Sequence, residues 1–331
     1  MSSILPLAAG CCSFWRWAAE GDPYGVLIPA LYNACMLMKA SGLRKPFLIA
    51  SLVLLMAGLV GGYWAYDRGR PAPIPTKKKL REGVIYRRLV RYSPRLMIAH
   101  VLVIDTRTRG VRLFVTPADA QEGPPLRART TSEFMEEFGV QIAINGDGFN
   151  PWWSHSPADY YPHSGDPVTP NGYAASGGKI YARGSEEPPE PTLFISRRGE
   201  LSFNKIPSRV FNAISGDRML VLHGEAAPGL DAAERDPRSA IGTNANGRWL
   251  YLVVVDGRQS LYSEGATFQE LADILVGLGA ETAMNLDGGG SSTLAVAGPD
   301  GQPVVLNSPI DSYIPGRERP VANHLGIFLE P

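Results

Sequence analysis

The segment from residue 249 to residue 287 constrains the fold most, because its three parts predict a strand, a helix and a second strand. Residues 249–256 (WLYLVVVD) and 281–287 (ETAMNLD) have the apolar and β-branched content of buried strands. Residues 267–278 (TFQELADILVGL) carry apolar side chains at helical spacing, a T-x-x-E capping box, and a glycine after the last turn. If the strands are parallel, as such crossovers usually require, Asp256 and Asp287 lie at one sheet edge, where open α/β sheets bind ligands.

The rest of the C-terminal part continues as short strands with few helices. Strands are predicted at residues 84–92, 96–105, 111–116 and 140–145, and a short helix at residues 132–138. Residues 146–178, rich in Gly, Pro, Ser and aromatics, predict a long functional loop. The predicted fold class is α/β of the mixed α+β kind: a mixed sheet with few helices, forming a single domain over residues 83–331.

A transmembrane helix is predicted at residues 47–66 (FLIASLVLLMAGLVGGYWAY), which carry no charge and match the roughly 20 residues that cross a bilayer. Basic residues precede this run and charged residues follow it, which disfavours a buried core helix, and its length disfavours a cleaved signal peptide. Residues 1–46 form an N-terminal segment in which Met36 or Met38 offers a more usual start, and residues 67–82 a linker.

The orientation of this single-pass protein has two opposing indications. Charge counting alone keeps the domain inside, because more Lys and Arg follow the helix than precede it. Long domains translocate largely regardless of flanking charge, however, and a first helix commonly acts as a signal anchor. We therefore expect the C-terminal domain to be extracytoplasmic.

Composition limits the partners and cofactors. Lys plus Arg and Asp plus Glu both total 32, so no net field favours nucleic acid, which is excluded as an expected partner. All three cysteines precede residue 47, which leaves the domain without a disulfide or a cysteine metal site. His155 and His163 flank Asp159 and Asp166, but their spacing fits no standard zinc signature. No cofactor is expected to be required, with a divalent metal left open.

Residues 287–292 (DGGGSS) follow the second strand of the central segment. Three glycines allow a sharp turn whose amides point into one concavity, and such nests hold anions; the alternative is a tight loop. Arg238 enters a predicted strand, where it could fork onto a phosphate or, alternatively, pair with Asp236 or lie at the surface. Residues 256–258 (DGR) and 145–149 (NGDGF) also end strands, and either can be a simple turn.

Several of these motifs together resemble the phosphodiester glycosidase family. The matching stretches run in family order: residues 143–146 with Phe149, 238–242 (RSAIG), 255–258 (VDGR), 263–272, 283–292 (AMNLDGGGSS) and 319–323 (RPVAN). The resemblance covers residues 143–328, while the N-terminal span and residues 152–170 lie outside it. It implies hydrolysis of a sugar 1-phosphodiester at the glycosidic C–O bond, here expected in cell-envelope or exopolysaccharide metabolism.

Chemistry indicates a division of labour at such a site. A phosphate ester leaves readily, so it needs charge stabilisation, which Arg238 and the amides of residues 288–291 could supply. A carboxylate must activate water or attack the anomeric carbon; Asp287 is the first choice, with Asp256 or Asp147 as its partner. The expected substrate-binding residues are Asn145, Asp147, Arg258, Asn285, Gly288, Gly289, Gly290, Ser291, Ser292 and Asn323.

Three other readings use the same residues. A non-catalytic envelope module would bind polysaccharide through the turn and a platform of Trp152, Trp153, Tyr160 and Tyr161. A metal-dependent phosphodiesterase would cleave the P–O bond instead. A purely structural role is disfavoured, because polar, glycine-rich strand ends are a costly way to build a scaffold.

Overall fold

The computed structural model describes residues 50–58, 60–62, 70–120, 122–184 and 189–329, and the chain divides into two units, Met1–Asp67 and Arg68–Pro331. Residues 50–58 and 60–62 are helical, whereas the remainder of the predicted membrane span and residues 1–46 lie outside the described residues. Among the described helices, none is long and apolar enough to cross a bilayer.

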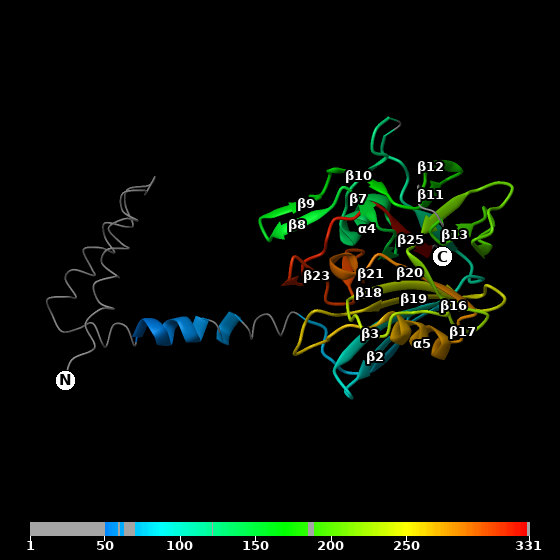
Figure 1. Ribbon diagram of the computed structural model, residues 1–331. Helices are drawn as coiled ribbons and strands as arrows, with labels where there is room; N and C mark the ends of the chain where they lie inside the picture. Colours follow the sequence, from blue (N-terminus) through cyan, green and yellow to red (C-terminus); the bar gives the residue numbers. More distant parts are fainter. Residues whose placement is uncertain (1–49, 59, 63–69, 121, 185–188, 330–331) are drawn as a thin grey trace, which may run out of the picture. The chain divides into compact units, whose positions relative to one another are not determined.

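The second unit is mostly β-sheet (Figure 1). The largest sheet has eight strands in the order β1-β2-β3-β19-β18-β20-β16-β17. In chain order these are β1 (Thr76–Arg81), β2 (Val84–Arg91), β3 (Met97–Asp105), β16 (Arg218–Leu222), β17 (Glu225–Ala226), β18 (Arg238–Thr243), β19 (Trp249–Val255) and β20 (Thr282–Leu286).

Two five-stranded sheets accompany the large sheet. The second sheet has the order β22-β21-β6-β25-β4, and the third has the order β12-β11-β15-β13-β14. The second contains β4 (Val111–Val115), β6 (Ile142–Asn145), β21 (Leu294–Ala297), β22 (Pro303–Val305) and β25 (His324–Leu329). The third contains β11 (Tyr173–Ser176), β12 (Lys179–Arg183), β13 (Thr192–Ile195), β14 (Leu201–Phe203) and β15 (Asn212–Ser215).

The smaller elements lie mainly in connections. They are the sheet of β5 (Leu126–Arg127), β10 (Pro167–Pro170) and β7 (Phe149–Asn150), and the hairpins β8 (Trp153–Ser156) with β9 (Asp159–Tyr161) and β23 (Ile310–Asp311) with β24 (Ile314–Pro315). The described part of this unit has three helices, α4 (Thr131–Phe138), α5 (Phe268–Leu278) and the 3-10 turn η1 (Gly289–Ser291). Residues 146–178, predicted as a loop, therefore contain five short strands.

The alternation of side chains along the strands explains the layers. On β19, Leu250, Leu252 and Val254 face a core shared with the second and third sheets. The intervening Tyr251, Val253 and Val255 pack against the apolar stripe of α5 on the other face of the large sheet. Both faces are covered, which accounts for the unbroken apolar run of this strand. Figure 1 shows α5 on one side of the large sheet and β25 and α4 on the other.

The two α-helices begin and end at capping residues. Thr130 with Glu133 and Thr267 with Glu270 form capping boxes at α4 and α5, and the left-handed Gly139 and Gly279 end the two helices.

The prediction of a mixed sheet is wrong for the described strands, because every ladder between named strands is antiparallel. β19 and β20 do run in the same direction, but β18 lies between them and is antiparallel to both. The crossover through α5 thus skips one strand position. The domain is mostly β rather than α/β.

The predicted linker, residues 67–82, also needs correction at its end. Thr76–Arg81 forms β1, which pairs with β2 at the edge of the large sheet. The three residues before Ile74 also contact the domain through their carbonyls. Pro71 accepts a hydrogen bond from Tyr262, Ala72 accepts one from Arg88, and Pro73 accepts one from Tyr92.

Candidate active site

The candidate site begins where β19 and β20 end. Ser239 on β18 lies opposite both Val254 on β19 and Leu286 on β20, so the residues that follow these two strands emerge at the same edge of the large sheet. Strand β6 of the second sheet ends at the same place: the amide of Asp287 donates a hydrogen bond of 2.9 Å to the carbonyl of Gly146, which directly follows β6. Strand ends from two sheets therefore build one site.

A cleft of about 420 Å³ opens at this edge. Its lining combines basic, acidic and amide side chains with a few apolar residues. The charged residues in it are Asp147, Glu190, Asp217, Asp236, Asp287, Arg238, Arg258 and Arg319, and the others include Asn150, Trp152, Asn171, Asn285, Gly288 and Gly289.

Three arginines reach this cleft from three different segments. The guanidinium of Arg238 stacks on Phe268 at 3.8 Å from the ring centre and donates to main-chain carbonyls. Arg258, in a left-handed conformation at φ 56°, donates to Asp236 at 2.8 Å. Arg319 donates to Asp311 at 2.8 Å and stacks on Trp152 at 4.8 Å. Guanidinium groups held in this way have the charge and the planar donors that suit a phosphate-like anion.

Burial of Arg238 lowers the pKa of its guanidinium below the ordinary value, and nearby acidic groups, Asp236 first, only partly offset this. Arg238 remains charged, because an arginine pKa lies far above neutrality. A buried positive charge that contacts carbonyls and an aromatic face gains from an incoming anion. Asp236, considered above as an ion-pair partner of Arg238, forms its ion pair with Arg258.

The glycines after Asp287 do not form the predicted anion nest. The amide of Gly289 donates to the carbonyl of Pro237, and the amide of Ser291 donates to Gly288. The amide of Gly288 serves the Asp287 carboxylate. Few amides of the turn are thus left for a ligand, so charge stabilisation rests with the arginine side chains.

The three glycines instead allow other groups to approach the backbone closely. A Cβ on Gly288 would lie 2.9 Å from the carbonyl oxygen of Pro237. At Gly289, whose φ is +60°, it would lie 3.2 Å from Arg258, and at Gly290 only 2.4 Å from Arg319. The GGG sequence is therefore the surface on which two of the cleft arginines rest.

Asp287 lies at the cleft with donors around its carboxylate. Burial raises its pKa above the ordinary value, against the hydrogen bond from Ser291, the charge of Arg319 and the amide of Gly288, which all lower it. A carboxylate at a cleft with a raised pKa and hydrogen-bond donors around it has the chemistry of a nucleophile or a base.

Asp147 and Glu190 form a second acidic group in the cleft. Burial and the neighbouring Glu190, which is hydrogen-bonded to it, raise the pKa of Asp147 well above its usual range, while the Gly172 amide, 2.7 Å from Oδ2, opposes this. Two carboxyls in contact favour retention of a proton between them, because ionising both places two negative charges side by side.

Residues 138–328, more than half of the chain, match the family model described as phosphodiester glycosidase. The chain belongs to the phosphodiester glycosidase family. It is accordingly a member of a family of hydrolases, and the cleft lined by residues 147–319 lies within the matched region.

Two solved structures share the fold. The catalytic domain of zebrafish N-acetylglucosamine-1-phosphodiester alpha-N-acetylglucosaminidase, auto-inhibited by its pro-peptide, gives a TM-score of 0.53 at 18% identity, over 78% of this chain and 85% of that one. A hypothetical protein from Synechocystis gives 0.51 at 18% identity, over 78% of this chain. This chain covers 64% of the Synechocystis protein. A search of curated protein sequences finds no match.

Several residues predicted for the site of this phosphodiester glycosidase family member lie behind the cleft. Asp256 is buried and accepts hydrogen bonds from His100 at 2.9 Å, Asn307 at 3.2 Å and the Ser308 amide at 2.8 Å. It does not border the cleft. Its carboxylate is occupied by an interior network, so the structure does not bring it together with Asp287 at the reaction centre.

Asn145 and Asn323 support the backbone rather than line the cleft. Asn145 donates to the carbonyl of Asp287 at 2.7 Å, and Asn323 accepts from the amide of Asp147 at 2.9 Å. Ser291 accepts from Arg319 at 3.4 Å, and Ser292 is buried outside the lining. These residues hold the catalytic candidates in place.

Asn285 does line the cleft, as predicted for a substrate-binding residue. Its amide nitrogen donates to Asp217 at 2.8 Å, while its buried amide oxygen has no hydrogen-bond partner in the described structure. Arg258, Gly288 and Gly289 line the cleft as well.

Sequence reasoning missed five polar or charged cleft residues: Asn150, Asn171, Glu190, Asp217 and Arg319. Arg319 begins the RPVAN stretch, so a signal for it was present. Glu190 follows a proline-rich, acidic segment (EEPPEP), in which no spacing distinguishes one glutamate from another.

The histidines that raised the metal alternative lie apart from this chemistry. His155 is 3.2 Å from Asp159, and His163 is 3.4 Å from Asp166, all with exposed or half-exposed side chains. No group of three or more His, Cys, Asp or Glu side chains with metal-binding geometry occurs within the described ranges.

Proposed function

We propose that the cleft hydrolyses the glycosidic C–O bond of a sugar 1-phosphodiester. The observation that carries the proposal is the meeting of Arg238, Arg258 and Arg319 with Asp287 and the Asp147 carboxyl in one cleft. The arginines supply an anion site and the carboxyls supply proton transfer, which are the two requirements of this reaction.

In this mechanism the phosphate of the substrate contacts the guanidinium groups. The bond between the anomeric carbon and the phosphate oxygen breaks, and its electron pair goes to that oxygen, where the arginines stabilise the developing charge. In one step, water attacks the anomeric carbon as the phosphate leaves; in two steps, Asp287 displaces the phosphate and water then displaces Asp287, and in either case a carboxylate takes the proton of the water. In this proposal the Asp147 carboxyl, whose pKa burial and Glu190 raise, donates a hydrogen bond to the substrate.

We further propose that residues 47–66 anchor the enzyme in a membrane with its domain outside, acting in cell-envelope or exopolysaccharide metabolism without a required metal. The charge-free apolar run supports the anchor. Fractionation of cells tests the anchor: the chain is expected to resist carbonate extraction, and added protease is expected to digest it in spheroplasts. Release by carbonate, or protection from protease, would contradict the anchor or the orientation.

The activity is tested with the full chain in detergent on UDP-N-acetylglucosamine and on para-nitrophenyl phosphodiesters of sugar 1-phosphates, in ¹⁸O water. Cleavage of the C–O bond is expected to place the label in free sugar. If the label instead appeared in a phosphate product, and EDTA abolished that reaction, the chain would be a metal-dependent phosphodiesterase. Binding without turnover would identify a polysaccharide-binding module.

Asp287→Asn is expected to lower kcat by about 10²- to 10⁴-fold with an unchanged melting temperature, because it removes the carboxylate charge but keeps the shape. Asp300→Asn is the matched control, since Asp300 lies in an exposed turn outside the cleft. Near wild-type turnover of a folded Asp287→Asn variant would remove Asp287 from the mechanism.

A further inference from the structure

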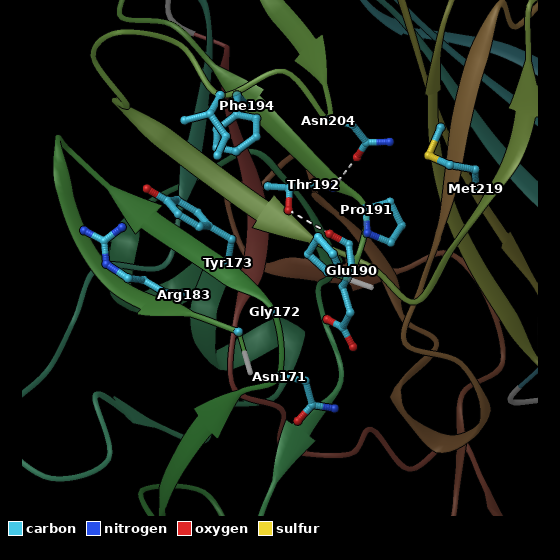
Figure 2. Close-up of a pocket in the computed structure, with 13 residues that line it drawn as sticks. Asn171, Gly172, Tyr173, Arg183, Glu190, Pro191, Thr192, Phe194, Asn204 and Met219 are labelled. Carbon is cyan, nitrogen blue, oxygen red and sulfur yellow. Dashed lines mark hydrogen bonds between the residues drawn. The ribbon is translucent and has the colours of Figure 1, made fainter. Parts of the chain in front are cut away.

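A second pocket of about 710 Å³, larger than the cleft, lies on the third sheet (Figure 2). Tyr173 on β11, Arg183 on β12 and Phe194 on β13 border it, together with Ile206 in the segment after β14. In Figure 2, the Glu190 carboxylate and the Asn171 amide lie at one end of this pocket, and Phe194 lies at the other.

The second pocket adjoins the cleft through two residues. Glu190 and Asn171 border both cavities, whereas Arg238, Arg258 and Arg319 border only the cleft. Glu190 and Asn171 therefore form the boundary between the two cavities. The Glu190 side chain at this boundary is also hydrogen-bonded to Asp147.

The lining of the second pocket differs in chemistry from the arginine-rich cleft. Tyr173 and Phe194 meet edge to face at 5.4 Å, and Ile206 is 65% exposed although it is a large apolar side chain. Polar groups stand beside these apolar surfaces, among them the side chains of Asn204 and Arg183. Aromatic and aliphatic faces with a few hydrogen-bonding groups suit a sugar ring, which has apolar C–H faces and polar edges.

We propose that this second pocket binds a second sugar residue, linked to the one whose anomeric bond is cleaved, so that the glycone of the substrate is at least a disaccharide. The inference rests on the proposed function, because that function places the phosphate at the arginines and the anomeric carbon at the carboxyls. The sugar side of the substrate then extends past Glu190 and Asn171. The phosphate and the first sugar occupy the smaller cleft, and the larger cavity receives the next residue.

The test compares ligands that differ only on the sugar side. Isothermal titration calorimetry of the full chain in detergent uses glucose 1-phosphate against maltose 1-phosphate, and N-acetylglucosamine 1-phosphate against chitobiose 1-phosphate. These monoesters carry no group on the far side of the phosphate, so any gain in affinity comes from the second sugar. At least one disaccharide is expected to bind about tenfold more tightly than its monosaccharide.

Ile206→Trp is expected to abolish this gain, because the larger side chain fills the pocket, while it leaves the affinity for the monosaccharide 1-phosphates unchanged. Ile206 is exposed, so the substitution is compatible with folding. Ile74→Trp is the matched control, since Ile74 is 62% exposed and borders neither cavity, and it is expected to keep the gain.

The outcomes separate the two proposals. Equal affinity for mono- and disaccharides in the wild-type chain, or a gain that Ile206→Trp leaves intact, would overturn the second-sugar site while the proposed function stands. Failure of all four sugar phosphates to bind would overturn the proposed function and the second-sugar site with it.

Discussion

The cleft places two kinds of carboxyl in two different environments. Asp287 accepts hydrogen bonds from Ser291 and the Gly288 amide and lies near the charge of Arg319, and these three oppose the rise in its pKa that burial causes. Asp147 has an acidic neighbour, Glu190, that adds to burial in raising its pKa. Both pKa values are raised, that of Asp147 the more strongly. Under the proposed function, Asp287 acts as the ionised carboxylate and the Asp147 carboxyl as the protonated group.

A bell-shaped pH profile of kcat/KM follows from these shifts. Activity is expected to fall as the pH drops through the raised pKa of Asp287, because that group must be ionised. It is expected to fall again as the pH rises through the raised pKa of the Asp147 pair, because the pair must keep its proton. Glu190→Gln removes one of the causes that raise the pKa of Asp147, so the alkaline limb should move to lower pH by about one unit or more.

The pH profile is measured with the substrate that shows the highest turnover. Glu200→Gln serves as the control for the loss of a negative charge, since Glu200 is exposed and lies outside the cleft. An alkaline limb that Glu190→Gln leaves unmoved would assign that limb to another group.

Asp256 illustrates a carboxylate whose sequence context resembles a site but whose side chain lies in an interior hydrogen-bond network. It belongs to a buried chain in which Tyr86 contacts His100 at 2.8 Å and His100 contacts Asp256. Asp256→Ala is expected to lower the free energy of unfolding by about 2 to 3 kcal/mol, because buried donors lose their acceptor. Urea denaturation measures this, and kcat of the folded fraction should stay near wild type. A large loss of kcat without loss of stability would return Asp256 to the chemistry.

At the scale of elements, the glycine turn after β20 positions two cleft arginines by letting them pack closely against its backbone. Gly289 and Gly290 begin η1, and the guanidinium groups of Arg258 and Arg319 lie where side chains would otherwise be. Asp311 and Trp152 fix Arg319 from the other side. The turn and the arginines are therefore one unit, and the position of the charge depends on the absence of a Cβ.

Gly290→Ala is expected to lower kcat/KM by about 10²-fold with little change in melting temperature. The new Cβ would lie 2.4 Å from the Nη2 atom of Arg319, which is the movable end of a flexible side chain, so the guanidinium shifts and the fold persists. Gly277→Ala is the matched control, because open space surrounds Gly277 in α5. It should keep full activity and gain about 0.5 to 1 kcal/mol of stability. Equal activity of the two variants would contradict this account of the GGG turn.

The sequence predicted the elements whose signals are local. The capping box at Thr267, the terminal Gly279, the short helix near residues 132–138 and the strands later seen as β19 and β20 all depend on neighbours in the chain. The insertion of β18 between β19 and β20 was not predictable, because antiparallel pairing is decided by tertiary packing.

The same division applies to the candidate site. Asp287 and Arg238 were identified from strand ends, and both line the cleft. Glu190 comes from a segment without periodicity, and the amides of the GGG turn were assigned to a ligand because their actual acceptors, such as the carbonyl of Pro237, lie far away in sequence. Partners that only the folded chain brings together leave no local pattern.

At the scale of the whole domain, the site depends on sheets that come together from distant parts of the chain. The large sheet supplies Arg238 and Asp287, and the loop after β6 of the second sheet supplies Asp147. The core between the sheets contains Leu252, Met284 and Ile144, so the strands that carry the cleft residues, or that precede their loops, are packed together. The positions of the cleft residues therefore depend on the stability of this packed core.

The edge formed by β1 gives the last prediction. A chain that starts at Gly83 lacks β1 and leaves β2 as an open edge, and the buried hydroxyl of Tyr262 loses its acceptor, the carbonyl of Pro71. Compared with a chain that starts at Arg70, its free energy of unfolding should fall by about 2 to 3 kcal/mol.

Urea denaturation of both chains measures the difference, and light scattering reports association through the open edge. Tyr262→Phe in the longer chain isolates the single hydrogen bond and should cost about 1 kcal/mol. If the shorter chain matched the longer one in stability and stayed monomeric, residues 70–82 would be a linker after all. A larger loss than that of Tyr262→Phe places residues 70–82 within the folded domain, because the shorter chain also lacks the β1 pairing and the carbonyls of Ala72 and Pro73.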